Sequence, residues 1–553
     1  MQALIEKFFN PGLSAKLVFI VVTPIILYWP GIHRHWELTQ NPFFVPYDAA
    51  QYIPAFFQFD SHDPIPSTYA KEYYLNAVCP LLYKVLFRIG AQLGDVRQFH
   101  FLMVYLAYAG FLVVMGRLGW ILGGAALSFA VVALTISAWI FIGLGFIGGA
   151  PRMYAYPLIS LILYALILDR PKLLAGIVVL GGLLYPIVAL IGGACLTCWM
   201  LLKPFSSRGL VSGWGFSRRL AVVALTGTLS VTTLLPLILG AGTYGRRIVE
   251  TDISIYPEAG PDGNYRPYDQ LPYKIFGYEL LSYFAGPFYS HGDPVVPWLN
   301  AHKHLDPMTL LFVLALAGLL ILVITVLGLK WLIGEYDGGG ARLISFFVIC
   351  AALHVVAWLA SPYLYIPTRY FMFSLPFLIT LIFPWALQRL LLQHRFLKLS
   401  CRRVTLAFIA LICVYLAAFG GRGNAELSDA FVESRSQPLF EAIAALPKNS
   451  VIAGWPVGPV RKLEYVTRRN AFLTGDLHQV LHLKFTQAMR ERMDALFDAY
   501  LSTDGAALYR LREQFGVTHM IVDIRDFSDP KHAPEYFAPW RARIQPRLAE
   551  SKG

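Results

Sequence analysis

The sequence predicts a polytopic α-helical membrane protein that ends in a small α/β soluble domain. Of the 553 residues, 56% are hydrophobic and only 14% are charged, whereas soluble domains carry about 25% charged residues. Apolar runs that can span a hydrocarbon core about 30 Å thick recur as far as residue 420. Beyond residue 420 short helical and strand patterns alternate. We therefore expect a transmembrane domain over 1–420 and a soluble domain over 421–553.

About eleven apolar segments of the first 420 residues are expected to cross the membrane. The first of them follows a basic flank and shows no clear cleavage site, so we expect it to be retained. A long apolar stretch is divided at Tyr185-Pro186, because proline removes a backbone donor and favours a break. The expected crossings are 15–32, 99–116, 119–135, 151–168, 173–184, 186–201, 220–241, 307–333, 342–360, 370–388 and 403–420.

Charge asymmetry predicts the orientation of these crossings. Segments 203–219 and 389–403 contain basic residues and no acidic ones, which is typical of cytoplasmic flanks. With eleven crossings and a cytoplasmic amino terminus, both segments fall on the cytoplasmic side. The same count places the large loops 33–98 and 243–306 outside the cytoplasm. It also exports the soluble domain, 421–553.

The soluble domain is predicted from alternating patterns after residue 420. SVIAGWP and VTHMIVDI have the composition of buried strands, whereas LFEAIAALP, QVLHLKFTQAMRERMDALFDAY and GAALYRLREQFG have helical spacing of apolar residues. Alternation of helix and strand is typical of an α/β domain. In the first outer loop, YYLNAVCPLLYKVLFRIG predicts an amphipathic helix that lies at the membrane interface.

The first outer loop holds the main candidate for chemistry. Asp48, in PYDAAQYIPAF, lies just outside the first crossing, where a carboxylate can take a proton from an acceptor hydroxyl or hold a cation. The alternative is a solvated acid, or a cap for a helix that begins at Ala49. Asp60 and Asp63, in FDSHDP, are a candidate second acidic element or turn residues before a proline.

Two arginines are expected at the outer ends of crossings. They are Arg152, in GGAPRMYAYP, and Arg369, in YLYIPTRYF. An arginine at the membrane edge can extend to the headgroups, but its planar fork also suits a phosphate. Tyr52, Tyr365 and Tyr370 are candidates to line a substrate site, although aromatic side chains are expected at the interface in any case.

Other features favour structural roles. The net charge of +12 invites a nucleic-acid partner, but the basic residues flank apolar runs, so no nucleic acid is expected. Gly143–Gly149 matches the dinucleotide pattern inside an apolar hairpin, where close helix packing or a flexible turn is expected. Cys195 and Cys198 lie in an apolar run with no second pair, so we expect no metal there. His354 is expected to be a neutral histidine bonded to a neighbouring helix.

These motifs and this topology resemble the GT-C-type polytopic glycosyltransferases, which depend on polyprenyl-phosphate sugars. PYDAAQY resembles the first-loop acidic motif of that superfamily, and IPTRY resembles its late arginine motif. The tail, with a strand after LPKNS and then GVTHMIVD, resembles the tails of an uncharacterised bacterial branch. The resemblance implies a GT-C-like fold in a bacterial inner membrane. It also implies transfer of a hexosyl or pentosyl unit to a glycan, lipid or protein acceptor on the outer face.

The resemblance also implies roles for single residues. Asp48 would be catalytic, Arg369 and Arg152 would bind the donor phosphate, and the exported domain could cover the acceptor site. The region 136–150 lacks a D-x-D or E-x-D pair, which departs from the family pattern. No metal ligands are therefore assigned, and no cofactor is certain.

Three other kinds of protein stay open as alternatives, and one of them is a non-catalytic membrane scaffold whose tail recruits partners. A transporter or flippase of lipid-linked saccharides would need charged residues deep in its crossings, whereas the acids here cluster in the outer loops. A polymerase or ligase of such saccharides would use outer-loop arginines in the same way, and the sequence separates it poorly from a glycosyltransferase.

Overall fold

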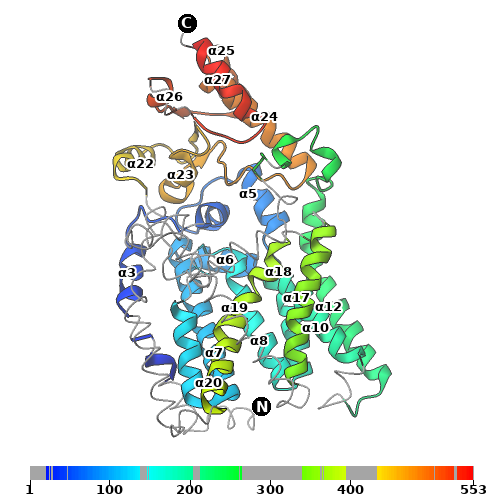
Figure 1. Cartoon of the computed structure of the whole chain (residues 1–553). Helices are drawn as coiled ribbons and strands as arrows, with labels where there is room; N and C mark the ends of the chain where they lie inside the picture. The colour runs from blue at the N-terminus through cyan, green and yellow to red at the C-terminus, as the bar shows by residue number, and fades with distance from the viewer. Residues whose placement is uncertain are drawn as a thin grey trace, which may run out of the picture.

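Apolar helices form an upright bundle, and an α/β unit lies at one end of it (Figure 1). This computed structural model describes residues 20–393 and 432–551, apart from 24, 27–28, 47, 138–145, 147, 203–211, 261, 265–338, 361–363, 365–366, 504, 529–531 and 533. The expected crossings 307–333 and 403–420 therefore lie outside the described residues, as do most of loop 243–306 and Tyr365. The total number of crossings stays a prediction.

The described bundle is that of a polytopic membrane protein. Four of its stretches are long and apolar enough to cross a membrane by length and composition, namely Val96–Ile136, Phe216–Gly242, Arg342–Leu359 and Thr368–Arg389. Three shorter apolar helices accompany them. The elements are α7 (Val96–Ser137), η4 (Pro151–Tyr154), α8 (Ala155–Ile167), α9 (Pro171–Leu184), α10 (Pro186–Leu201), α12 (Phe216–Gly242), α17 (Gly339–Leu359), α18 (Thr368–Met372), α19 (Leu375–Phe377), η9 (Leu378–Ile382) and α20 (Phe383–Gln393).

The turn between the second and third expected crossings lies later than the sequence predicted. The sequence placed it between 116 and 119, but the non-helical residues inside α7 are Gly123 and Gly124. Ser128 Oγ donates a hydrogen bond of 2.6 Å to the carbonyl of Gly116, so the chain folds back on itself after the turn. The helix continues past the predicted point because glycine at 119 lets the two arms touch, since a Cβ there would lie 2.8 Å from Ser128 Cα.

The predicted break at Tyr185-Pro186 is confirmed. Helix α9 ends at Leu184, α10 begins at Pro186, and Tyr185 between them is extended, with φ −156° and ψ 99°. The two helices pack closely, because a Cβ on Gly181 would lie 2.8 Å from the backbone nitrogen of Ala189. The expected helices at 220–241 and 342–360 are also present, as α12 and α17.

The first loop is mostly helical and lies at the same end of the bundle as the α/β unit (Figure 1). The expected amphipathic helix is broken at Pro80, which follows an extended Cys79. Its second part, α6, buries Tyr83 and Phe87 and exposes Ile89. The loop contains α3 (Trp29–Thr39), α4 (Ala49–Tyr52), η1 (Ile53–Phe59), α5 (Tyr69–Tyr73), the π-helical turn η2 (Tyr74–Val78) and α6 (Leu81–Leu93).

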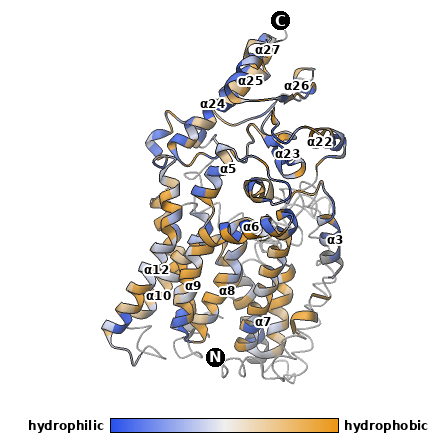
Figure 2. Cartoon of the chain, turned by 180° about the vertical axis from the view of Figure 1, so that it is seen from behind, coloured by the Kyte–Doolittle hydropathy of each residue, from blue (hydrophilic) through white to orange (hydrophobic). Residues whose placement is uncertain are grey.

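The carboxyl-terminal unit, residues 432–551, is built around a parallel sheet of three strands in the order β2-β1-β3. Ile452 of the central strand pairs with Ala471 on one side and His519 on the other. Both expected strands and all three expected helices are present, and the unit is more hydrophilic than the bundle (Figure 2). Its elements are α22 (Gln437–Ala444), β1 (Val451–Gly454), α23 (Val460–Thr467), β2 (Asn470–Ala471), α24 (Leu483–Tyr500), α25 (Ala506–Phe515), β3 (His519–Ile521), α26 (Arg525–Ser528) and α27 (Trp540–Ser551).

The turn in α7 gives a first testable prediction. Gly124 has φ +77° and ψ −160°, a conformation that is essentially restricted to glycine and costs other residues about 1–3 kcal/mol. We expect Gly124→Ala to lower the apparent melting temperature of the purified protein. Open space surrounds its Cβ position, so the loss would come from the backbone alone.

Gly110 is the matched control for this substitution. It lies inside the same helix, also has open space at its Cβ position, and does not have a positive φ. Alanine is about 1 kcal/mol better than glycine inside a helix, so Gly110→Ala should leave the melting temperature unchanged or raise it. Equal losses in the two variants would contradict the assigned turn.

Candidate active site

A cavity of about 490 Å³ lies where the bundle, the first loop and the carboxyl-terminal unit meet. It is lined by five residues that the sequence singled out, although they come from three distant segments of the chain. These are Asp48, Tyr52, Arg152, Arg369 and Tyr370. Asp48 and Arg369 therefore line one and the same cavity.

Close backbone packing holds Asp48 in place. We call the part of the lining formed by Asp48, Arg152 and Arg369 the base of the cavity. Asp48 precedes α4, but its side chain makes no capping hydrogen bond, so the cap alternative is wrong. Instead, Arg152 Nη2 lies 2.5 Å from Asp48 Oδ2. Glycine at 148 permits this position, because a Cβ there would lie 2.9 Å from both Cβ and the backbone nitrogen of Asp48. Close packing is thus the observed role of the glycine at 148.

The two arginines enter the cavity from helix starts. Arg152 lies in η4, directly before α8, and its side chain is only 11% exposed, so it is part of the cavity wall rather than extended into a headgroup layer. Arg369 lies in α18, just after Pro367. His354 Nδ1 is 2.9 Å from the carbonyl oxygen of Pro367, so this buried histidine links α17 to the turn that carries Arg369. That contact is the structural role expected for it.

One side of the cavity is apolar. It is formed by the start of α10 and the end of α12, and Leu190 and Ile238 on this side are 40% and 57% exposed. The Tyr185-Pro186 break creates this side, because both residues of the break line the cavity. The surface suits a hydrocarbon chain better than a sugar. The apolar lining residues of the two helices are Ile187, Leu190, Leu234, Leu237 and Ile238.

Another part of the cavity lining is polar, and sequence reasoning missed it. It is formed by Arg461, Asp476, Gln479 and His482 of the carboxyl-terminal unit, with Arg247 from the segment after α12. We call these five residues the roof. Arg461 Nε donates a 2.6 Å hydrogen bond to Asp476 Oδ2. The run GDLHQ that follows β2 was the available signal, because ligands of α/β sheets often bind beyond the carboxyl ends of strands.

The part of the roof directly before α24 is a loop where the sequence predicted the start of a helix. The predicted helix began at Gln479, whereas α24 begins at Leu483. The backbone before α24 instead bonds to other segments: Ile248 donates to the carbonyl of Leu481 at 3.1 Å, and Leu483 donates to that of Arg246 at 2.9 Å. These tertiary bonds replace the first helical turn and hold the roof against the segment that follows α12.

His482 supplies a neutral polar group to the roof. Burial, together with the positive charge of Arg247, lowers the pKa of His482 from 6.5 to about 4. Its Nδ1 lies 2.9 Å from the hydroxyl oxygen of Tyr73. At neutral pH the ring is therefore uncharged, and it can serve as one donor and one acceptor.

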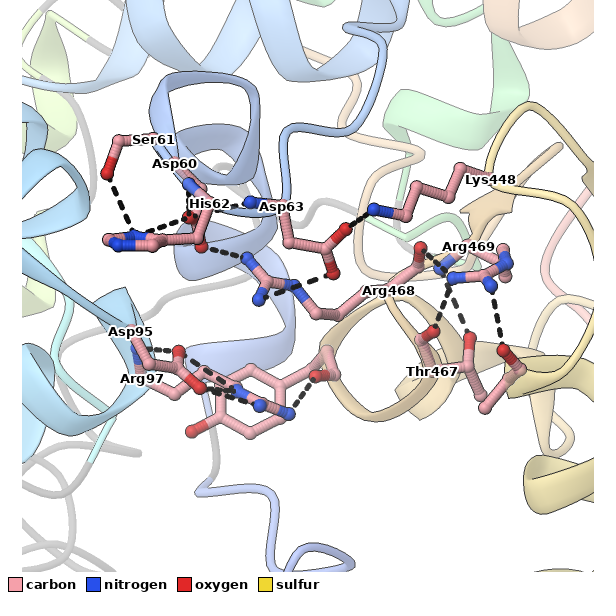
Figure 3. A network of polar contacts seen from close by, with 12 residues as sticks. Asp60, Ser61, His62, Asp63, Asp95, Arg97, Lys448, Thr467, Arg468 and Arg469 are labelled. Atoms are coloured by element: carbon pink, nitrogen blue, oxygen red, sulfur yellow. Dashed lines mark hydrogen bonds and ion pairs between the residues drawn. The ribbon is translucent and has the colours of Figure 1, made fainter.

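Asp60 and Asp63 do not line the cavity. Asp60 accepts hydrogen bonds from the backbone nitrogens of His62 at 2.9 Å and Asp63 at 3.1 Å, and it forms an ion pair with Arg468 (Figure 3). Asp63 forms an ion pair with Lys448, and its other oxygen lies 3.7 Å from Arg468. The candidate second acid is thus corrected to a turn that joins the first loop to the carboxyl-terminal unit.

A buried lysine completes this junction. Lys71 Nζ lies 2.5 Å from Asn470 Oδ1 and 3.3 Å from Glu464 Oε1, and the side chains of the lysine and the glutamate are 3% and 4% exposed. Gln51 lies in α4, close after Asp48, and its side chain donates a 2.7 Å hydrogen bond to the backbone carbonyl of Asp476. The roof and the base of the cavity are therefore fixed relative to each other.

Among the described residues, one cluster has the composition of a metal site, and it lies outside the cavity. Ligand atoms of Asp523, Asp526 and His532 are within 4.8 Å of one another. Asp523 is paired with Arg525 at 2.5 Å, and Tyr500 donates to Asp526 at 2.6 Å. Both carboxylates are therefore already bonded to side chains of the protein itself. Within the described part of the chain, the cavity itself has no such cluster.

Of the three comparisons with known proteins, only the one with solved structures finds similar proteins. No family model matches the sequence, and no curated protein matches it. The crystal structure of ArnT from Cupriavidus metallidurans in the apo state is 16% identical over 89% of this chain and 92% of its own, with a TM-score of 0.41. That of the same protein bound to undecaprenyl phosphate is 14% identical over 88% and 91%, with a TM-score of 0.40. This likeness assigns no role to any single residue of the chain.

The buried lysine gives the second prediction. Lys71→Met removes the cation that Glu464 faces, and loss of one partner from a buried ion pair costs about 3–5 kcal/mol. We expect a large drop in the apparent melting temperature of the full-length protein in detergent.

The exposed pair Arg435–Glu433 provides the matched control. Its side chains are 61% and 62% exposed, and exposed pairs contribute only about 0–1 kcal/mol. Arg435→Gln should therefore change the melting temperature little. If Lys71→Met were as mild as Arg435→Gln, the lysine would not hold the two parts together.

Proposed function

We propose that this chain is a glycosyltransferase that moves a sugar from a polyprenyl-phosphate-linked donor to an acceptor on the outer face of the membrane. The observation that carries the proposal is the composition of the cavity. One wall is apolar, the base contains Asp48 with two arginines, and the roof is polar. A lipid, a phosphate and a sugar would each meet a surface of matching chemistry.

The proposed donor site has one part that binds the phosphate and another that binds the lipid. Arg369 and Arg152 would hold the phosphate, because their planar forks match its oxygens. The lipid would lie against Leu190 and Ile238, which are apolar and exposed. The sugar would then occupy the space between the arginines and the roof, close to Tyr52 and Tyr370.

The reaction follows from this placement. The acceptor hydroxyl oxygen attacks the anomeric carbon, and the bond from that carbon to the phosphate oxygen breaks. The electron pair of the broken bond stays on the phosphate, where the arginines stabilise the developing charge. The hydroxyl proton passes to the Asp48 carboxylate as general base. The products are the glycosylated acceptor and the polyprenyl phosphate.

The acceptor would enter beneath the roof. Arg461, Gln479 and His482 offer hydrogen bonds there, which suits a hydroxyl-rich glycan, lipid or protein acceptor. Localisation in a bacterial inner membrane, with the roof outside, fits the clustering of the first loop and the carboxyl-terminal unit at one end of the bundle (Figure 1). The basic segments 203–219 and 389–403 would face the cytoplasm.

The alternative functions share part of this chemistry. A transporter or flippase needs charged groups near the middle of the bilayer, whereas the arginines of the cavity lie at helix starts at one end of the bundle. A polymerase or ligase would use the same cavity but would take a saccharide from a lipid diphosphate. Identifying the released lipid as a monophosphate or a diphosphate separates it from the proposed activity.

The proposal is tested at Asp48. Asp48→Asn keeps the shape of the side chain and removes its charge, and loss of a general base typically slows a reaction about 10²–10⁴-fold. We expect membranes that contain this variant to release far less polyprenyl phosphate from a panel of radiolabelled polyprenyl-phosphate sugars. The variant should not lose its affinity for the donor.

Glu37→Gln is the control for Asp48→Asn. Glu37 is an acid of the same loop, its side chain is 61% exposed, and it does not line the cavity. Its variant should release polyprenyl phosphate at the parent rate. A fully active Asp48→Asn variant would refute the role of Asp48 as base.

Arg369 gives a separate prediction about the phosphate. Arg369→Lys keeps the charge but loses the fork, and a hydrogen bond to a charged group contributes about 1.5–3 kcal/mol. We expect affinity for a polyprenyl monophosphate to fall at least about tenfold. Arg218→Lys, at the start of α12 and outside the cavity, should bind as the parent does. Unchanged affinity at Arg369→Lys would exclude it as the phosphate ligand.

A further inference from the structure

Asp48 and Arg152 are in contact with each other, and the proposed reaction needs both of them for other tasks. Arg152 Nη2 lies 2.5 Å from Asp48 Oδ2, and the two side chains are 11% and 15% exposed. The reaction requires the carboxylate to accept a proton from the acceptor, and it requires the guanidinium to contact the donor phosphate. A carboxylate that is ion-paired with a guanidinium is stabilised in its charged form, so it takes up a proton less readily than a carboxylate without such a partner.

We propose that the donor phosphate draws Arg152 away from Asp48, so that the base becomes available only when the donor is bound. This inference rests on the proposed function and deepens it. Arg152 is then a positioning residue for Asp48 as well as a phosphate ligand. The donor therefore has to be bound before the acceptor can be deprotonated, whichever of the two substrates arrives first.

The local structure is suited to such an exchange of partners. Arg152 extends from a single 3-10 turn, η4, which precedes α8. Asp48 is fixed more firmly, because its backbone packs against Gly148 and accepts hydrogen bonds from the backbone of Gln51 and Tyr52 at 3.0 and 3.2 Å. The cavity that both residues line also contains Arg369. A phosphate at Arg369 would therefore offer the guanidinium of Arg152 a second anion without any movement of Asp48.

The exchange predicts a change in the affinity for phosphate that depends on Arg152, which a role of Asp48 as general base alone does not predict. If Asp48 and the phosphate compete for Arg152, each weakens the contact of the other with it, because coupling between two contacts is reciprocal. Removal of the Asp48 charge should then strengthen the binding of phosphate. A base with no such role would change phosphate binding only through its own charge, and that change would persist when Arg152 is replaced.

The experiment is a double-mutant cycle on the purified full-length protein in detergent. The probe is a short-chain polyprenyl monophosphate, and its dissociation constant is measured by calorimetry for the parent, Asp48→Asn, Arg152→Gln and the double variant. We expect Asp48→Asn to bind the probe at least about fivefold more tightly, in the range of ordinary coupling energies. Arg152→Gln should bind more weakly, and adding Asp48→Asn to it should change the affinity by less than about twofold.

Asp476 provides the matched control for charge alone. It lines the same cavity and is paired with its own arginine, Arg461, at 2.6 Å. A general electrostatic effect would make Asp476→Asn tighten binding as much as Asp48→Asn does, whereas the exchange predicts a change below about twofold. Asp48→Ser makes the same test if the asparagine variant fails to fold.

Three results would overturn the exchange. They are an unchanged affinity in Asp48→Asn, an equal gain in Asp476→Asn, and a gain from Asp48→Asn that persists in the Arg152→Gln background. A parent protein that binds no polyprenyl monophosphate would overturn the proposed function itself, and the exchange with it. A parent protein that binds the probe without coupling would overturn the exchange alone.

Discussion

The amine of Lys71, enclosed between Asn470 and Glu464, joins the first loop to the carboxyl-terminal unit. The cavity depends on this contact because its base belongs to the loop and the bundle, whereas most of its roof belongs to the unit. A buried charge is tolerated only when it is paired and hydrogen bonded, so the two parts have one favourable alignment. The ion pairs of Arg468 with Asp60 and Asp63 also join the first loop to the carboxyl-terminal unit (Figure 3).

Interruptions of the backbone create the space in which the site lies. The break at Tyr185-Pro186 separates α9 from α10 and puts both residues of the break on the cavity wall. Pro367 precedes the helix that carries Arg369, and its carbonyl is held by His354. Lipid-exposed backbone must satisfy its own hydrogen bonds, so irregular backbone at this depth is tolerated where it lines a cavity. The same residues that end the helices therefore also shape the site.

The sequence predicted most of the base of the cavity and little of its roof. Asp48, Arg152 and Arg369 each follow a proline by one or two residues, outside or at the end of an expected crossing, and such positions can be recognised from one sequence. Arg461 and Asp476 were not recognised, because they reach the site only through the docking of the carboxyl-terminal unit. The same docking recruited Asp60 and Asp63 into ion pairs. The turn at Gly124 was misplaced because helix packing, rather than the apolar pattern, decides where α7 folds back.

The pairing of Asp48 with Arg152 also bears on how the site is kept stable before substrate arrives. A partly buried carboxylate without a partner destabilises the folded protein, and the same holds for a partly buried guanidinium. Contact between them offsets both costs in the resting protein. A donor phosphate that takes over Arg152 supplies a replacement anion, so the guanidinium stays paired while Asp48 gains its reactive form. The Asp48 carboxylate, which Arg152 neutralises in the resting site, is therefore the same group that later takes the proton of the acceptor.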